Sequence, residues 1–205
     1  LDTLIQDNQY DTIYHEHLRY YSLSSLKYLF SKHGLEIIDA KKINTHGGSI
    51  RVYAAKKNRY KVADQYNDLL INEKNNLFKK DLFNFKEKVV KSKVNLYSLL
   101  SEIKFNNFKI YGISAPSRAT TLINYLGLSS DIIECILEID GSKKINHYLP
   151  GTDIPIYDEK KLYVDQPHFV IILSWHIANE IVNNLRKNGY KGKFIIPLPN
   201  PKIVN

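Results

Sequence analysis

From residue 108 onward, short apolar segments alternate with segments of helical periodicity, and this alternation constrains the fold more than any other feature of the chain. The pattern predicts strands over 108–113, 132–140, 168–174 and 193–196, with helices over 119–126 and 178–187. Alternating strands and helices are typical of a parallel sheet covered by helices. The strand at 168–174 is apolar almost throughout, as expected when both faces are buried. We therefore predict a small Rossmann-like three-layer α/β domain with a parallel sheet.

The first part of the chain follows a different pattern, a helix and then two strands in close succession. Ser22 and the hydroxyl residues after it are N-cap candidates, and Gly34 follows the helix where a positive φ is usually needed. Segments 35–40 and 49–55 have the composition of strands, and a turn-forming segment with two glycines separates them. Their closeness in sequence predicts an antiparallel pair at a sheet edge.

A helical stretch joins these two parts. Its leucines and phenylalanines recur at helical spacing without a proline, which predicts one or two long amphipathic helices that act as a connector. The chain carries a formal net charge of +8, and between Lys56 and Lys104 twelve Lys or Arg side chains stand against six Asp or Glu. Because these lysines interleave with the apolar positions, we expect a solvated helix face and no nucleic-acid partner.

The composition excludes several classes of protein. No apolar run approaches the roughly 18 residues that span a bilayer, so a soluble, cytoplasmic protein with no membrane partner is expected. Cys135 is the single cysteine, which excludes a disulfide framework and a cysteine-built zinc site within this sequence. The sequence begins at Leu1 with no signal peptide, and we therefore expect a fragment of a longer protein.

The turn after the first predicted strand of the α/β domain is a candidate anion site. The sequence from Gly112 to Arg118 leads into a helix, and such a turn presents backbone N–H groups and the positive end of a helix dipole. Arg118 with the hydroxyls of Ser114 and Ser117 can complete a phosphate cradle. The three-glycine dinucleotide fingerprint is absent, so NAD is not expected. Asp140 ends the second strand, where a ribose-binding acid often sits, and ordinary loop packing is the alternative for both motifs.

The densest group of chemically active side chains is the tetrad Tyr14, His15, Glu16 and His17. Two imidazoles, a carboxylate and a phenol can supply a general base, a group that orients it and a hydrogen-bond donor. The spacing matches neither the helical HExxH motif nor a familiar structural zinc site, and we predict no metal site in this chain. The alternative is a polar loop whose histidines cap neighbouring elements.

A third group consists of His46, two glycines and Ser49, followed by Arg51. Adjacent glycines allow a positive φ, and the plain interpretation is a hairpin turn. In the functional alternative, this loop folds over a site and His46 or Arg51 contacts a ligand.

Taken together and in order, these motifs resemble those of a known family, the S-adenosylmethionine-dependent C-methyltransferases that act on nucleotide-linked keto-deoxysugars. The resemblance rests on residues 14–17, 22–23, 33–35, 46–49 with 51, 112–118, 149–152 with 154–155, and 195–197. It covers essentially the whole chain, and several motifs in register are more specific than any one of them.

The resemblance implies a three-part enzyme with a cysteine-rich zinc domain, a central cofactor domain of methyltransferase fold and a Rossmann-like C-terminal domain. On that plan residues 1–57 are the last elements of the truncated central domain. Residues 58–205 are the C-terminal domain, with a helical connector at 58–104 and a βαβ part at 105–205. The zinc-ligand cysteines and the glycine-rich cofactor turn are missing from this sequence. The resemblance therefore implies that S-adenosylmethionine is bound mainly, and zinc entirely, outside this chain, which alone is inactive.

The resemblance also implies a reaction in which a base generates an enolate next to the keto group of the sugar. His17 is implied as that base, Tyr14 as the hydrogen-bond donor to the enolate oxygen, and Glu16 as a group that holds a sugar hydroxyl or orients the base. Exchanging the roles of His17 and His15 is an alternative.

The expected partner is a nucleotide-diphosphate sugar, and its remaining contacts are assigned to His46, Arg51, Ser114, Ser117, Arg118 and Asp140. Family members commonly have a lysine-glycine-asparagine run where this chain has Arg118, Ala119 and Thr120. An arginine can still bind a diphosphate bidentately. A non-catalytic nucleotide-sugar-binding or docking module without a cofactor domain is the alternative function, and a methyltransferase for another acceptor is a further one.

Overall fold

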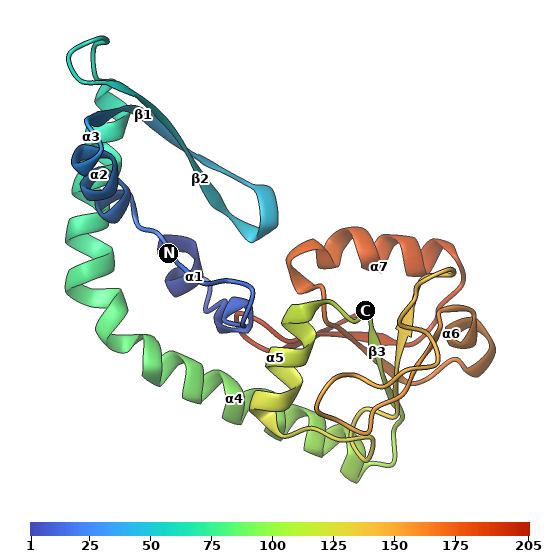
Figure 1. The fold of residues 1–205 in the computed structure, drawn as a ribbon. Coiled ribbons are helices and arrows are strands. Elements are labelled where there is room, and N and C mark those ends of the chain that lie inside the picture. The colour runs from blue at the N-terminus through green and yellow to red at the C-terminus, as the bar shows by residue number, and fades with distance from the viewer. The chain divides into compact units, whose positions relative to one another are not determined.

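The computed structural model describes residues 1–205 apart from the side chains of residues 78–80, and Figure 1 shows the fold as a ribbon. The chain divides into two compact units. The first contains Leu1–Gln9 and His17–Lys88, and the second contains Tyr10–Glu16 and Val89–Asn205. A short segment near the N-terminus therefore belongs to the same unit as the C-terminal half. The predicted domain boundary after residue 57 stays a prediction. The assignment of the first part to a methyltransferase domain stays a prediction.

Helix α2 (Leu23–Lys32) of the first unit begins where the sequence predicts. The Ser22 hydroxyl accepts a hydrogen bond from the Ser25 N–H at 3.1 Å, and the Ser25 hydroxyl accepts one from the Ser22 N–H at 2.9 Å, which is a capping box. The Glu73 carboxylate accepts the N–H groups of the first two helical residues at 2.6 and 2.8 Å. Gly34 follows with φ +71°, which confirms the predicted end.

The predicted antiparallel pairing is confirmed for β1 (Leu35–Ile43) and β2 (Ser49–Lys56), which form a two-stranded sheet of their own, so the predicted place at the edge of a larger sheet stays a prediction. The short 3-10 helix η2 (Thr45–Gly47) joins the two strands. Helices α1 (Asp2–Gln6) and α3 (Asp64–Asn72) complete the regular elements around them. Side chains from α2, β1 and α3 share one apolar cluster, formed by Leu23, Ile37, Ala40 and Tyr66.

The predicted helical connector is continuous. Helix α3 passes through the π-helical segment η3 (Glu73–Asp81) into α4 (Leu82–Phe105), whose end lies in the second unit. Leu96 and Leu100 are completely buried, as the apolar stripe predicts, whereas Leu82 is 43% exposed.

Most described lysines between 56 and 104 are exposed, which agrees with the predicted solvated face. Lys79 and Lys80 fall outside the described side chains. Within the part of the chain that is described, no helix is both long and apolar enough to cross a membrane.

A six-stranded sheet organises the second unit in the order β5-β4-β3-β6-β7-β8. Its strands are β3 (Ile110–Ile113), β4 (Cys135–Glu138), β5 (Ile156–Asp158), β6 (Phe169–Ile172), β7 (Lys193–Ile196) and β8 (Lys202–Val204). Strands β3 to β7 run parallel, and β8 pairs with β7 in the antiparallel sense. The predicted Rossmann-like α/β fold with a parallel sheet is confirmed.

Helices cover both faces of this sheet. Helix α5 (Ser117–Leu126) follows β3, α6 (Lys160–Asp165) follows β5, and α7 (Ala178–Lys187) follows β6. The crossover from β3 to β4, through α5, moves across the sheet in one direction, and the crossovers from β5 to β6 and from β6 to β7, through α6 and α7, move in the other. Because such crossovers are right-handed, α5 lies on one face of the sheet and α6 and α7 lie on the opposite face. Leu162 of α6 and Leu185 of α7 share a core with the side chains of β3, β4, β6 and β7. The unit thus has the predicted three layers, with α5 and α7 on opposite sides of the sheet (Figure 1).

The sequence predicts four strands, and the structure adds β5 and β8 at the two edges together with the short helix α6. Each of these strands has three residues and α6 has six. Segments this short do not display a period of two or of 3.6 residues, which is the signal that identified the other elements.

Candidate functional site

The segment from Tyr10 to Glu16 enters the second unit as the 3-10 turn η1 (Tyr10–Thr12). The Tyr10 ring lies edge-on to that of Tyr125 on α5, with 5.3 Å between the centroids. Burial raises the pKa of the Tyr10 phenol well above its usual range, so the group is neutral at physiological pH. Asp11, the next residue, is 1% exposed. A carboxylate so deeply buried requires polar partners.

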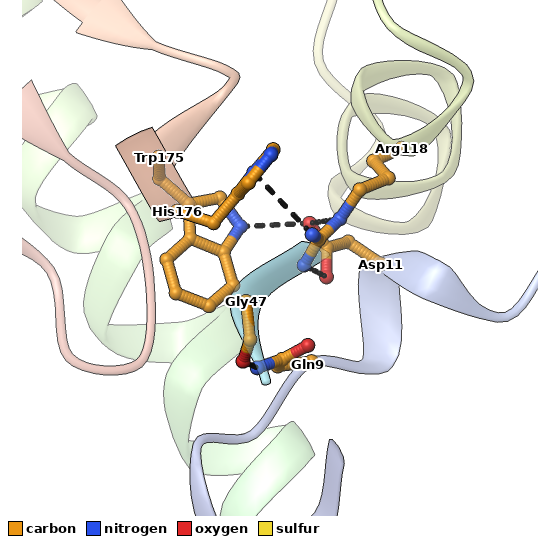
Figure 2. Close-up of polar contacts among 6 residues, drawn as sticks. All are labelled: Gln9, Asp11, Gly47, Arg118, Trp175 and His176. Atoms are coloured by element: carbon orange, nitrogen blue, oxygen red, sulfur yellow. Dashed lines mark hydrogen bonds and ion pairs between the residues drawn. The ribbon is translucent and has the colours of Figure 1, made fainter. Parts of the chain in front are cut away.

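Arg118, in the first turn of α5, is the main partner of Asp11. Its Nε donates to Oδ2 of Asp11 at 3.0 Å and its Nη2 donates to Oδ1 at 2.9 Å, so the ion pair is bidentate (Figure 2). The indole Nε1–H of Trp175 donates to the same carboxylate at 2.8 Å. Asp11 therefore accepts three hydrogen bonds from two side chains.

Two aromatic rings surround the Arg118 guanidinium. Its central carbon lies 5.0 Å from the centroid of the Trp175 ring, within range of a cation–π interaction. Its Nη1 lies 3.4 Å from Nδ1 of His176. Because a guanidinium only donates, that imidazole nitrogen accepts in the tautomer protonated at Nε2. Both aromatic residues belong to the 3-10 turn η4 (Trp175–Ile177), which comes shortly after β6.

This cluster lies at the carboxyl edge of the parallel sheet. Strands β3 and β6 are neighbours in the same direction, with Ile113 paired to Ile172, and the chain leaves both of them toward α5 and η4. The order of strands reverses here, because β4 lies on one side of β3 and β6 on the other. In open α/β sheets, ligands bind in the crevice at such a switch point.

The backbone of the β3–α5 turn is also engaged by the chain itself. Ser114 adopts φ +68° and donates its N–H to the Leu137 carbonyl at 2.9 Å. The Ala115 N–H donates to the Glu138 carboxylate at 2.6 Å. Two of the protein's own carboxylates therefore bind at the predicted phosphate site: Glu138 accepts from the Ala115 N–H of the turn, and Asp11 accepts from the Arg118 guanidinium. The contacts of Ser114, Ser117 and Arg118 with a diphosphate stay predictions.

A cavity of about 340 Å³ lies beside this turn. Ser117 and Thr120 of α5 line one part of it, and the exposed basic residues Lys143, Lys144 and His147 line another. Lys144 is held against the turn, because its Nζ donates to the Ala115 carbonyl at 2.6 Å and lies 3.4 Å from the Glu138 carboxylate.

No sequence motif identifies these basic residues. Their only signal was two adjacent lysines just after the second strand of a parallel sheet. Asp140 lies two residues beyond β4, where its exposed carboxylate pairs with Lys160 at 2.8 Å. The Lys160 ammonium lowers the pKa of Asp140 below its ordinary value.

The loop with His46 lies in the first unit. His46 adopts φ +54° within η2 and is exposed, and Arg51 is exposed on β2 opposite Lys41. The Gln9 side chain, itself 4% exposed, donates to the Gly47 carbonyl at 2.7 Å, as Figure 2 also shows. The predicted hairpin turn is confirmed, whereas contact of His46 or Arg51 with a ligand stays a prediction.

One residue separates the tetrad from the end of η1. Tyr14 lies in a bend and is half-buried, and His15 and Glu16 form an exposed turn, so the segment is not an extended strand. The rings of Tyr14 and His15 meet edge to face with 6.4 Å between centroids, and those of His17 and Tyr20 do so at the same separation. The side chains of the tetrad are thus accessible, and their catalytic roles stay predictions.

Across the described residues, no three His, Cys, Asp or Glu side chains gather in a group that could hold a metal ion. At the β3–α5 turn, Glu138 binds the Ala115 N–H and Asp11 binds the Arg118 guanidinium.

Comparison with known proteins gives two findings. A family model described as "C-methyltransferase C-terminal domain" matches residues 44–199. The chain is also 30% identical over 208 aligned positions to the C-methyltransferase NovU of Streptomyces niveus. That alignment covers 98% of this chain and 49% of the relative, so the chain spans about half the length of the curated relative that it matches.

Proposed function

This chain belongs to the family of C-methyltransferase C-terminal domains, and on that premise we propose that it is part of an S-adenosylmethionine-dependent C-methyltransferase acting on a nucleotide-diphosphate keto-deoxysugar. The relative is about twice as long, which leaves room for a cofactor domain beyond the residues described here. The methyl donor would be held there.

The observation that carries the proposal is the position of Asp11. Its carboxylate is fixed by Arg118 and Trp175 at the carboxyl edge of the parallel sheet, where α/β folds bind ligands. Tyr14 follows three residues later, which puts its Cα within about 11 Å of that of Asp11. The segment with Tyr14 and Glu16 therefore starts at the edge of the sheet where we expect the ligand.

In the proposed reaction, His17 removes a proton from the sugar carbon next to the keto group. The C–H electron pair moves into the enolate, and the proton stays on the imidazole. Tyr14 donates a hydrogen bond to the oxygen on which negative charge develops, and Glu16 holds a sugar hydroxyl or orients His17. The enolate carbon would then take the methyl group from S-adenosylmethionine. The S–CH3 electron pair would stay on sulfur, so that the neutral thioether S-adenosylhomocysteine leaves, and His17 would release its proton to solvent.

We assign the diphosphate of the substrate to the cavity beside α5. Lys143, Lys144 and His147 line it together with hydroxyls at the start of the helix, so cationic groups and the positive helix end face the same space.

Solvent exchange tests this function. The full-length protein, incubated in D₂O with a dTDP-linked 4-keto-deoxysugar, is expected to exchange hydrogen for deuterium at the carbon next to the ketone. With the methyl donor added, it is expected to methylate that carbon. Binding without exchange or transfer would contradict the proposal and favour a non-catalytic nucleotide-sugar-binding module. Transfer to an acceptor without a ketone would contradict the enolate.

A further inference from the structure

The guanidinium of Arg118 lies at the switch point of the sheet, where a Rossmann-like fold would hold the anionic part of a ligand. In this protein the anion is Asp11, a residue 107 positions earlier in the chain. Its two oxygens meet Nε and Nη2 in the same bidentate geometry that a phosphate would use. The third nitrogen, Nη1, faces His176.

The pair is closed to solvent and supported from several sides. The Asp11 side chain is 1% exposed and that of Arg118 is 10% exposed. Trp175 donates to the carboxylate through its indole N–H, and its ring lies 5.0 Å from the guanidinium carbon, within cation–π range. A ligand phosphate that approached Arg118 would have to expel a buried carboxylate with three hydrogen bonds. Glu138 occupies the backbone donor of the adjacent turn in the same way.

The segment has a second anchor on the same helix. Tyr10 contacts Tyr125 while Asp11 contacts Arg118, and these two helical positions are seven residues apart, which places them on one face of α5. Two consecutive residues thus fix η1 along about two turns of helix. The chain continues into Tyr14 only three residues beyond this attachment.

We propose that Asp11 is a positioning residue, a built-in anion that takes the ligand position at the switch point and thereby fixes the segment carrying Tyr14 and Glu16 to the carboxyl edge of the sheet. The assignment to catalysis rests on the proposed function, whereas the anchoring itself does not. The ion pair thus occupies the anion-binding position of the fold and anchors the segment with Tyr14 and Glu16. The diphosphate of the substrate then binds in the cavity lined by Lys143 and Lys144.

Amide hydrogen exchange on the 205-residue chain tests the anchoring without any activity. Asp11→Asn keeps the size of the side chain but removes its charge and one acceptor. We expect exchange at residues 12–16 to quicken on the order of tenfold, while the amides of β3 exchange as in the wild type. Trp175→Phe removes one donor and keeps a ring over Arg118, so a smaller increase at the same amides is expected. Unchanged exchange at residues 12–16 in both variants would overturn the anchoring.

Addition of dTDP tests whether Arg118 keeps Asp11 as its internal anion or exchanges it for a diphosphate ligand. We expect exchange at residues 12–16 of the wild-type chain to be unaffected by saturating dTDP, because Asp11 keeps its place. Faster exchange there would show that a diphosphate displaces Asp11 from Arg118 and would contradict the proposal.

The full-length enzyme tests the catalytic consequence. Asp11→Asn is expected to lower kcat, by up to about a hundredfold if the reactive groups shift by 1 Å, with the KM for the nucleotide sugar within about twofold. A raised KM with unchanged kcat would assign Asp11 to substrate binding instead. If wild-type enzyme transfers no methyl group, the proposed function fails while the exchange experiment still decides the role of Asp11.

Discussion

Asp11 and Arg118 form a bidentate ion pair, with 3.0 Å from Nε to Oδ2 and 2.9 Å from Nη2 to Oδ1, inside a region where both side chains are nearly inaccessible to water. The pair joins a turn near the N-terminus to a helix of the α/β fold. Removing one member would leave the other as an uncompensated buried charge, so the two residues depend on each other.

Replacement of Asp11 by leucine is expected to destabilise the second unit by about 3–5 kcal/mol, since Arg118 then stays buried without a counter-charge. The double variant Asp11→Leu with Arg118→Met is expected to lose less, because no unpaired charge remains. Urea unfolding followed by the fluorescence of Trp175, the single tryptophan, measures both. Equal losses in the single and double variants would show that the charge pair is not the source of the effect.

Substitution of His17 by alanine in the full-length enzyme is expected to lower methyl transfer by about 10²–10⁴-fold, the usual contribution of a general base. Binding of S-adenosylmethionine, measured by calorimetry, should stay unchanged. His15→Ala is the matched control, since it alters an exposed imidazole two residues away in the same segment. A larger loss in the control than in His17→Ala would exchange the two roles.

Lys143→Ala is expected to weaken binding of dTDP or GDP to this chain by about threefold to tenfold, which corresponds to one charge-assisted contact. The effect should shrink at high salt, because the lysine is exposed and its charge is screened. Lys187→Ala, at the exposed end of α7, removes the same charge from the same unit outside the cavity and should leave the affinity unchanged. Similar losses from both variants would point to non-specific attraction.

Cys135, 2% exposed in β4, is expected to resist alkylation in the folded chain and to react once urea unfolds it. Burial raises its pKa from 9.0 to about 12. Below pH 9 the thiol is protonated in both states, so its contribution to stability is complete. Between pH 9 and about 12 the unfolded chain loses the proton and the folded chain keeps it, and stability falls as pH rises.

Comparison with Cys135→Ala isolates this effect, because the variant shares every tyrosine that ionises over the same interval. The fall in the free energy of unfolding between pH 9 and pH 11 is expected to be smaller in the variant. Equal slopes would contradict the assignment of the pH dependence to Cys135.

Local patterns predicted the elements that local interactions stabilise. The capping box of α2 needs residues three positions apart, and the parallel strands need runs of apolar side chains, so both can be recognised in sequence. The edge strands and α6 were missed because their positions depend on neighbours already in the sheet.

The same holds for the site: its local turn could be recognised in the sequence, whereas its contacts between residues far apart in the chain could not. The turn before Arg118 predicted a bound phosphate, which stays a prediction, whereas in the structure the guanidinium binds the Asp11 carboxylate. Asp11 lies 107 positions away, and no spacing rule connects residues across that distance. Lys143 and Lys144 lacked a recognisable motif because their role depends on lying near the start of α5 in space.

The short outer strands have a consequence for behaviour at high concentration. Strands β5 and β8 border the sheet of the second unit, and each has only three residues, so each border presents few backbone groups to another molecule. Pro201 precedes β8 and lacks an N–H, and Lys202 adds a charge at the same border. The sheet is thereby guarded against edge-to-edge aggregation, which parallel strands exposed during slow folding would otherwise promote.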